Sequence, residues 1–184
     1  TPIQRARIIF KYKEIIENYE TSSIGLDKWK DYVTSFGFGN FLGYDHPTGK
    51  RGFIPSSDYY NRWYNNSWRA STTISNSIGQ GEVLTTPIQL ANFAAIIANK
   101  GWYIPPHFVK NIENDSIDKN YKNIKETLIS EKHFDPIIKG MIDVVEKGTA
   151  QNSKIKGITF AGKTGTAEDS SGGADHAWFA GFAP

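Results

Sequence analysis

The segment at residues 86–98 places the tightest constraint on the fold, because it predicts a helix that is apolar on most of its faces. Thr86 before Pro87 is typical of a helix start, and Gly101 stands where a helix commonly ends. Between Pro87 and Gly101, Ala, Ile, Leu and Phe fill nine of the thirteen positions. A helix that is apolar nearly all round is buried inside a larger core. The chain must therefore pack other elements around this helix.

The composition is that of an ordinary globular protein. The chain has 184 residues, of which 39% are hydrophobic, 14% aromatic and 22% charged, and this balance argues against wholesale disorder. No apolar run approaches the roughly 20 residues of a membrane span, so we expect neither a membrane span nor a signal peptide within these residues. The net charge of +2 lacks the basic bias of a nucleic-acid binder. Cysteine is absent, which excludes disulfides and thiolate sites.

Hydrophobic periodicity predicts an α+β fold. Further helices are expected at residues 2–19, 26–33 and 134–145, and strands at 102–112, 158–167 and 177–183. The last two strands are expected to pair antiparallel as a hairpin. Residues 39–71 are rich in Gly, Pro, Asn and Ser, and we expect a long ordered surface loop with little regular structure that its Tyr and Trp side chains hold in place. Residues 113–126 are expected to form a polar connection.

Residues 157–164 match the phosphate-loop pattern GxxxxGK[ST] letter for letter. That pattern binds nucleotide only where a buried strand precedes it and a helix begins at its last residues. Here the preceding residues are polar, and Gly165 and a Gly/Ser loop follow Thr164. Nucleotide binding is therefore the weaker alternative.

The same lysine opens the motif Lys163, Thr164, Gly165, Thr166, which resembles the third motif of penicillin-binding proteins and serine β-lactamases. The resemblance implies that Lys163 binds a substrate carboxylate and stabilises the negative charge that develops during acyl transfer. It implies that the backbone N–H of Thr166 is an oxyanion-hole donor, so Lys163 and Thr166 are the candidate catalytic residues. Thr164 and Gly165 are candidate substrate-binding residues, because a hydroxyl can bind the carboxylate and a glycine lets a substrate lie along the strand.

The segments around this motif strengthen the resemblance. Residues 36–45, 77–91, 144–150 and 175–184 resemble family segments in the family's order, over roughly residues 29–184. The similarity is greatest to class B penicillin-binding proteins of the PBP2 type, which are elongation-specific D,D-transpeptidases. The implied fold is an antiparallel sheet flanked by helices, and the implied domain is a single transpeptidase domain over residues 1–184.

The nucleophile motif of the family, S-x-x-K, does not occur in its expected place. The two S-x-x-K strings, at residues 116–119 and 153–156, lie in a polar connection and just before the KTGT motif. No S-x-N motif precedes the first helix. We therefore expect a partial transpeptidase domain that is incomplete at both ends and inactive by itself.

For the parent protein, the resemblance implies cross-linking of peptidoglycan stem peptides through an acyl-serine intermediate, with β-lactams as inhibitors. It also implies other cell-wall elongation proteins as partners, and a place on the periplasmic face of the bacterial inner membrane through a segment absent from this chain. A non-catalytic β-lactam-sensing or binding module of the same fold is the alternative.

The four histidines show no metal-ligand spacing, so we expect no metal and no cofactor. His176 follows Asp175 at the start of the last strand and either pins the hairpin or contacts substrate; we take it as a candidate substrate-binding residue. Trp178, two residues later, is expected in the core.

Overall fold

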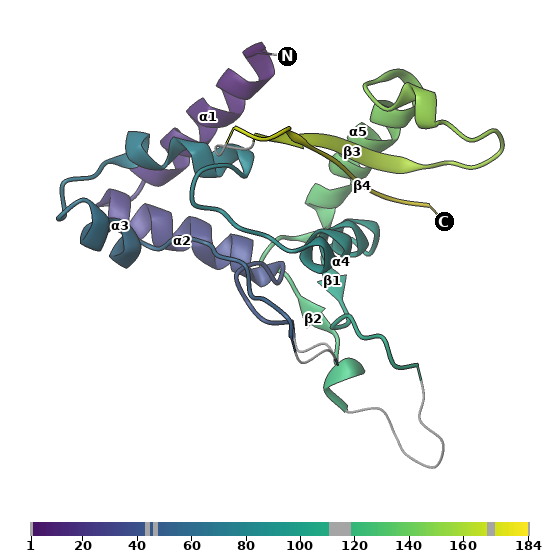
Figure 1. Ribbon diagram of the computed structural model, residues 1–184, viewed down its shortest axis with the longest axis horizontal. Coiled ribbons are helices and arrows are strands. Elements are labelled where there is room, and N and C mark those ends of the chain that lie inside the picture. The colour runs from purple at the N-terminus through teal and green to yellow at the C-terminus, as the bar shows by residue number, and fades with distance from the viewer. Residues whose placement is uncertain (1, 43–44, 46–47, 111–118, 169–171, 184) are drawn as a thin grey trace. The chain divides into compact units, whose positions relative to one another are not determined.

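A computed structural model describes residues 2–42, 45, 48–110, 119–168 and 172–183 (Figure 1). The chain divides into two compact units, one from Thr1–Leu42 with Thr48–Thr86 and the other from Gly43–Pro47 with Pro87–Pro184. Each unit has its own packing.

The first unit is helical. It contains α1 (Pro2–Glu17), α2 (Ser22–Ser35), α3 (Ser57–Trp63) and the 3-10 segment η1 (Ala70–Ile78). Thr21 caps α2 by accepting a hydrogen bond from the backbone N–H of Ile24. Helices α1 and α2 approach closely at Gly25, where a Cβ would lie 2.1 Å from the carbonyl oxygen of Ile16. The core of this unit consists of Tyr12, Ile16, Leu26, Tyr60, Trp68 and Ala70.

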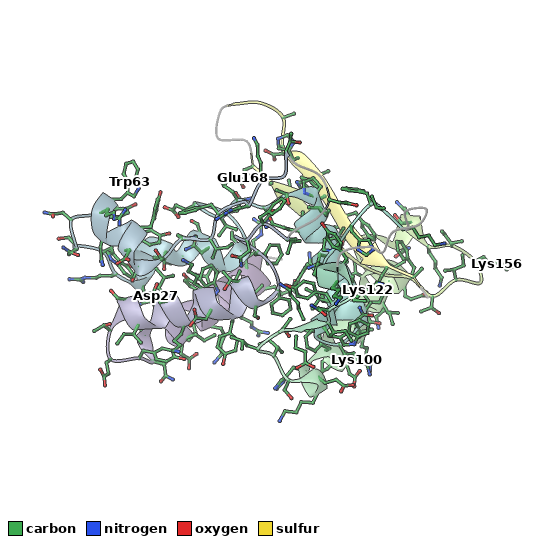
Figure 2. All side chains as sticks on the ribbon, turned by 90° about the horizontal axis from the view of Figure 1, so that it is seen from below. Asp27, Trp63, Lys100, Lys122, Lys156 and Glu168 are labelled. Carbon is green, nitrogen blue, oxygen red and sulfur yellow. The ribbon has the colours of Figure 1, made fainter. Side chains whose placement is uncertain are left out.

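The prediction of a loop with little regular structure at residues 39–71 is wrong in part, because it contains α3 and the start of η1. The side chain of Ser56 caps α3, and Asp27 on α2 accepts hydrogen bonds from the backbone and hydroxyl of Ser57. Tyr60 and Trp68 are buried, as expected of side chains that hold the segment in place. Trp63 instead projects outward with 72% of its surface exposed (Figure 2).

The second unit places two helices against a β-hairpin (Figure 1). Helix α4 (Pro87–Ala98) packs on β4 (His176–Phe182), and α5 (Phe134–Lys147) packs on β3 (Ala161–Ala167). Strands β3 and β4 pair antiparallel, as do the short strands β1 (Trp102–Tyr103) and β2 (Lys125–Glu126). The remaining elements are the 3-10 turns η2 (Lys119–Tyr121), η3 (Glu131–His133) and η4 (Gln151–Ser153).

The predicted strand at residues 102–112 is wrong beyond Tyr103, while residues 111–118 lie outside the described part of the chain. Pro105 and Pro106 have no backbone N–H for a ladder. The amides of Phe108 and Val109 donate instead to the two oxygens of the Asp45 carboxylate, at 2.8 and 2.7 Å. The short strand β2 lies within the expected polar connection, where two exposed charged residues gave no strand pattern.

Asp45 is expected to make this segment sensitive to acid. The amides of Phe108 and then Val109 lower the pKa of the Asp45 carboxyl. Stabilisation from a lowered pKa is present above the unfolded value of about 3.9 and is lost as the pH falls through the lower folded value. We expect the backbone amide NMR signals of Phe108 and Val109 to move together with a midpoint below about pH 3.9.

The substitution Asp45→Asn should move both signals at neutral pH, whereas Asp135→Asn, which removes a charge elsewhere, should leave them in place. Amide signals that do not respond to acid or to Asp45→Asn would show that the carboxylate does not hold this segment.

Candidate functional site

The KTGT motif lies on β3, and its register with β4 is complete. Lys163 lies opposite Ala180, Gly165 opposite Trp178, and Thr166 opposite Ala177. The predicted antiparallel hairpin is therefore confirmed. The phosphate-loop alternative is wrong, because Thr164 continues a strand where a nucleotide-binding loop requires a helix to begin.

The pleat of β3 divides the motif between two faces, since successive side chains in a strand point to opposite sides. Thr164 and Thr166 share one face with Phe179 of β4, and Lys163 and Gly165 share the other with Trp178. A single ligand can therefore reach the ammonium and both hydroxyls only along the edge of β3 that faces away from β4.

Two contacts hold the polar groups of the motif. The Lys163 Nζ donates to the backbone carbonyl of Thr164. The Oγ1 atom of Thr164 lies 2.9 Å from that of Thr149, which follows the C-terminal end of α5. The sequence placed Thr149 in a segment that resembles the family, but only the folded chain brings its hydroxyl to the motif.

The glycines of the hairpin differ in what surrounds them. A Cβ on Gly162 would lie 2.1 Å from the ring of Phe179, and one on Gly181 would lie 2.6 Å from the carbonyl oxygen of Ala161. Both positions are glycine because the hairpin packs tightly there. A Cβ on Gly165 would meet only the Cβ of Trp178, at 3.8 Å, and the φ angle of Gly165 is not in the left-handed region. Neither packing within the described residues nor backbone conformation requires glycine at 165.

His176 lies at the far end of the hairpin from Lys163. It opens β4 opposite Ala167, is exposed, and is four positions along the strand from Ala180, the partner of Lys163. Its proposed contact with substrate stays a prediction. Trp178 was expected in the core, and that expectation is wrong: 43% of its surface is exposed, and its cross-strand partner is Gly165, which has no side chain to cover it.

The S-x-x-K string at residues 153–156 does not form a nucleophile–base pair. Ser153 ends the 3-10 turn η4, not a buried helix, and is exposed. Lys156, the lysine of this string, is exposed as well, so neither residue lies in a buried site. The other string includes Ser116, which lies outside the described residues.

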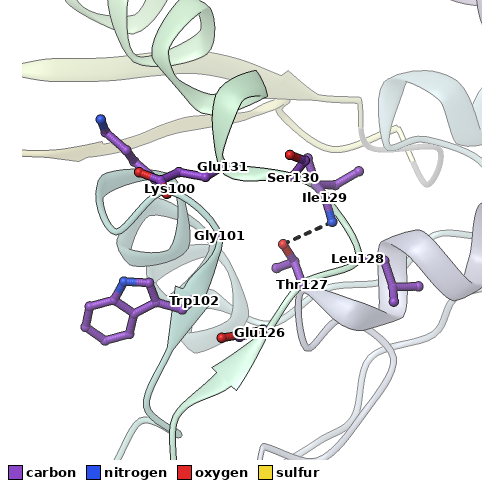
Figure 3. Close-up of a pocket in the computed structure, with 9 residues that line it drawn as sticks. All are labelled: Lys100, Gly101, Trp102, Glu126, Thr127, Leu128, Ile129, Ser130 and Glu131. Atoms are coloured by element: carbon purple, nitrogen blue, oxygen red, sulfur yellow. Dashed lines mark hydrogen bonds between the residues drawn. The ribbon is translucent and has the colours of Figure 1, made fainter.

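A hollow of about 460 Å³ in the second unit lies among the turn after α4, β2 and the segment that leads to η3 (Figure 3). Residues from 100–102 and 126–131 line it, and none of them belongs to β3 or β4. The Lys100 ammonium at its rim pairs with Asp135 at 2.8 Å, which raises the pKa of Lys100. The candidate site on β3 is thus a strand edge distinct from this hollow.

Metal binding and membrane insertion can be judged from the described residues. Across the described residues, no cluster of three or more His, Asp or Glu side chains is arranged to hold a metal ion. None of the described helices has the length and apolarity to cross a membrane.

Comparison with known proteins gives the family. Residues 12–184 match the family described as "Penicillin binding protein transpeptidase domain". The chain belongs to this family. Peptidoglycan D,D-transpeptidase MrdA of Acinetobacter baumannii is 31% identical over 208 aligned residues, which cover 96% of this chain and 30% of that protein.

Solved structures of penicillin-binding proteins have the same fold. Pseudomonas aeruginosa PBP2, in complex with WCK 5153, is 32% identical with a TM-score of 0.74, over 85% of this chain and 36% of that one. A complex between PBP2 and MreC from Helicobacter pylori gives 30% identity and a TM-score of 0.66, over 91% and 32%. The predicted penicillin-binding α+β fold is confirmed, and the chain spans about a third of the length of these relatives.

Proposed function

We propose that this chain supplies the carboxylate-binding and oxyanion-binding part of the active site of a peptidoglycan D,D-transpeptidase, within one domain that includes residues 1–184. The observation that carries the proposal is the open space beside Gly165 on the Lys163 face of β3, next to the edge of β3 that faces away from β4. A glycine that the fold does not need, next to a cation and hydroxyls, is suited to a ligand that runs along the strand. Membership in the transpeptidase family supports the reaction.

In the proposed reaction, a serine hydroxyl attacks the penultimate D-Ala carbonyl of a stem peptide. The terminal D-Ala leaves with a proton as the ester forms, and an amine of a second stem peptide then displaces the serine and forms the cross-link. Lys163 would bind the terminal carboxylate together with the hydroxyls of Thr164 and Thr166. The Thr166 N–H would donate to the oxyanion of each tetrahedral intermediate. β-Lactams would acylate the same serine.

The nucleophile in this proposal is not Ser153. Ser153 and Lys156, the serine and lysine of the S-x-x-K string, are both exposed, whereas the family's nucleophile is expected to open a buried helix. The isolated 184-residue chain is therefore expected to form no acyl-enzyme with a fluorescent penicillin on a denaturing gel.

The full-length gene product is the positive control, and its band should disappear after preincubation with unlabelled penicillin. A covalent band on the isolated chain that maps to Ser116 or Ser153 would overturn the placement of the nucleophile. If the full-length gene product gives no band, the alternative of a non-catalytic binding module is favoured, and equilibrium binding of penicillin would then test that module.

The proposed setting is the elongation machinery at the periplasmic face of the bacterial inner membrane, reached through a membrane segment outside this chain. The H. pylori PBP2 structure with MreC supports a protein partner of that machinery. His176 is proposed as a rim residue on the Thr166 end of the site, because it lies opposite Ala167.

A further inference from the structure

We propose that Thr149 is a positioning residue for ligand binding at β3, and that it acts by orienting the hydroxyl of Thr164. The inference rests on the proposed function, in which Thr164 binds the carboxylate of the ligand. Its basis is the 2.9 Å separation between the Oγ1 atoms of Thr149 and Thr164, the contact that links the turn after α5 to the motif.

The turn that carries Thr149 is tightly fixed. The backbone amides of Gly148 and Ala150 both donate to the carbonyl of Val144, at 3.2 and 3.1 Å. A Cβ on Gly148 would lie 2.7 Å from the Cα of Val144, so only glycine lets the chain turn back so sharply at the end of the helix. Ala150, the residue that follows Thr149, is buried.

Helix α5, which leads into this turn, is also well packed. It lies against β3, and Val145 near its C-terminal end is fully buried. Thr149 is therefore presented to Thr164 by a short, hydrogen-bonded turn between two buried residues. A hydroxyl held in this way can set the geometry of its neighbour, which a mobile loop could not do.

The chemistry of two hydroxyls gives the contact a direction once a ligand binds. A threonine hydroxyl has one proton to donate and lone pairs to accept. A carboxylate can only accept, so Thr164 must give its proton to the ligand. Thr149 is then the donor to Thr164 Oγ1, and the two bonds form a chain in which each strengthens the other.

Without the Thr149 hydroxyl, the Thr164 hydroxyl loses its donor and rotates freely among its staggered positions. Part of the binding free energy must then be used to orient it again. The Thr149 side chain itself is exposed, so removing its hydroxyl should cost little packing. The effect is expected in ligand binding and not in the stability of the fold.

The test measures acylation of the full-length gene product by a fluorescent penicillin over a concentration series, which separates the initial dissociation constant from the acylation rate constant. Thr149→Val keeps the shape of the side chain and removes the hydroxyl. It should weaken initial binding by about 5–10-fold, because the lost hydroxyl orients the hydrogen bond that Thr164 donates to the charged carboxylate of the ligand. The acylation rate constant should change by less than about twofold. Thr149→Ser keeps the hydroxyl and should restore binding to within about twofold.

The double mutant tests whether Thr149 acts through Thr164. Thr164→Val should weaken binding more than Thr149→Val, and Thr149→Val added to it should have no further effect. Parent-like binding by Thr149→Val, or an equal loss in the Thr164→Val background, would overturn the inference while the proposed function stands. A loss that Thr149→Ser does not rescue, together with a lower melting temperature, would assign Thr149 a structural role. A parent that is never acylated would refute the proposed function itself.

Discussion

Adding one methyl group to Gly165 is expected to weaken ligand binding strongly and leave the fold intact. An alanine Cβ at this position meets only one atom within 4 Å, at the ordinary contact distance of 3.8 Å. In the proposed function, the ligand fills the same space. Gly165→Ala should therefore lower the second-order rate constant of acylation by a fluorescent penicillin roughly 10–100-fold, because overpacking typically costs about 1–3 kcal/mol.

Gly162, three residues earlier on the same strand, provides the matched control. Its Cβ would lie 2.1 Å from the Phe179 ring, which also contacts the Phe160 ring at a centroid distance of 5.3 Å. Gly162→Ala should thus destabilise the protein by about 2–3 kcal/mol and lower its melting temperature by several degrees. The same methyl group is expected to affect stability at 162 and binding at 165.

The comparison uses the full-length gene product, with thermal melts beside acylation rates for both variants. If Gly165→Ala melts well below the parent, glycine at 165 is structural and the open space beside it is not a ligand path. If Gly165→Ala is acylated at the parent rate, no ligand approaches the strand at this point.

The elements that the sequence predicted well are those whose pattern and packing agree locally. Helix α4 follows from an apolar run between Pro87 and Gly101, and α5 from apolar side chains at helical spacing. The β3–β4 hairpin follows from two apolar segments joined by a Gly/Ser loop, and it places the KTGT motif on a strand as predicted.

The elements that were missed depend on partners far away in the sequence. Helix α3 is anchored by Asp27, which lies 30 residues before Ser57. The backbone after Pro106 is held by Asp45, 63 residues before Phe108, and no local pattern reveals that bond. The Thr149–Thr164 contact spans 15 residues and depends on the packing of α5 against β3. Propensity and periodicity describe neighbours in sequence, so such bonds could not be predicted from them.

The candidate site could be predicted because its chemistry is concentrated in four consecutive residues. What the motif alone could not give is its division into two faces, with Lys163 on one and Thr164 and Thr166 on the other. That division follows only from the register with β4, and it restricts a common ligand to the free edge of β3.

The second large expected effect is at Lys163. Lys163→Ala should lower the acylation rate constant of the full-length gene product by roughly 10²–10³-fold, since one such electrostatic contact in a catalytic site is worth about 3–4 kcal/mol. The side chain is exposed, and its hydrogen bond is to the carbonyl of the adjacent Thr164. Its loss should therefore change the melting temperature little.

Lys156→Ala is the matched control for Lys163→Ala, because it removes the same charge from an exposed lysine in the loop before β3 (Figure 2). It should be acylated at the parent rate, which separates the specific contact from a general effect of net charge. Thr166→Ala should be milder than Lys163→Ala, since it removes a hydroxyl and leaves the backbone N–H that the proposal assigns to the oxyanion. Acylation of Lys163→Ala at the parent rate would refute the motif assignment. A Lys163→Ala protein that unfolds would make Lys163 structural, because a purely electrostatic role predicts slow acylation by a folded protein.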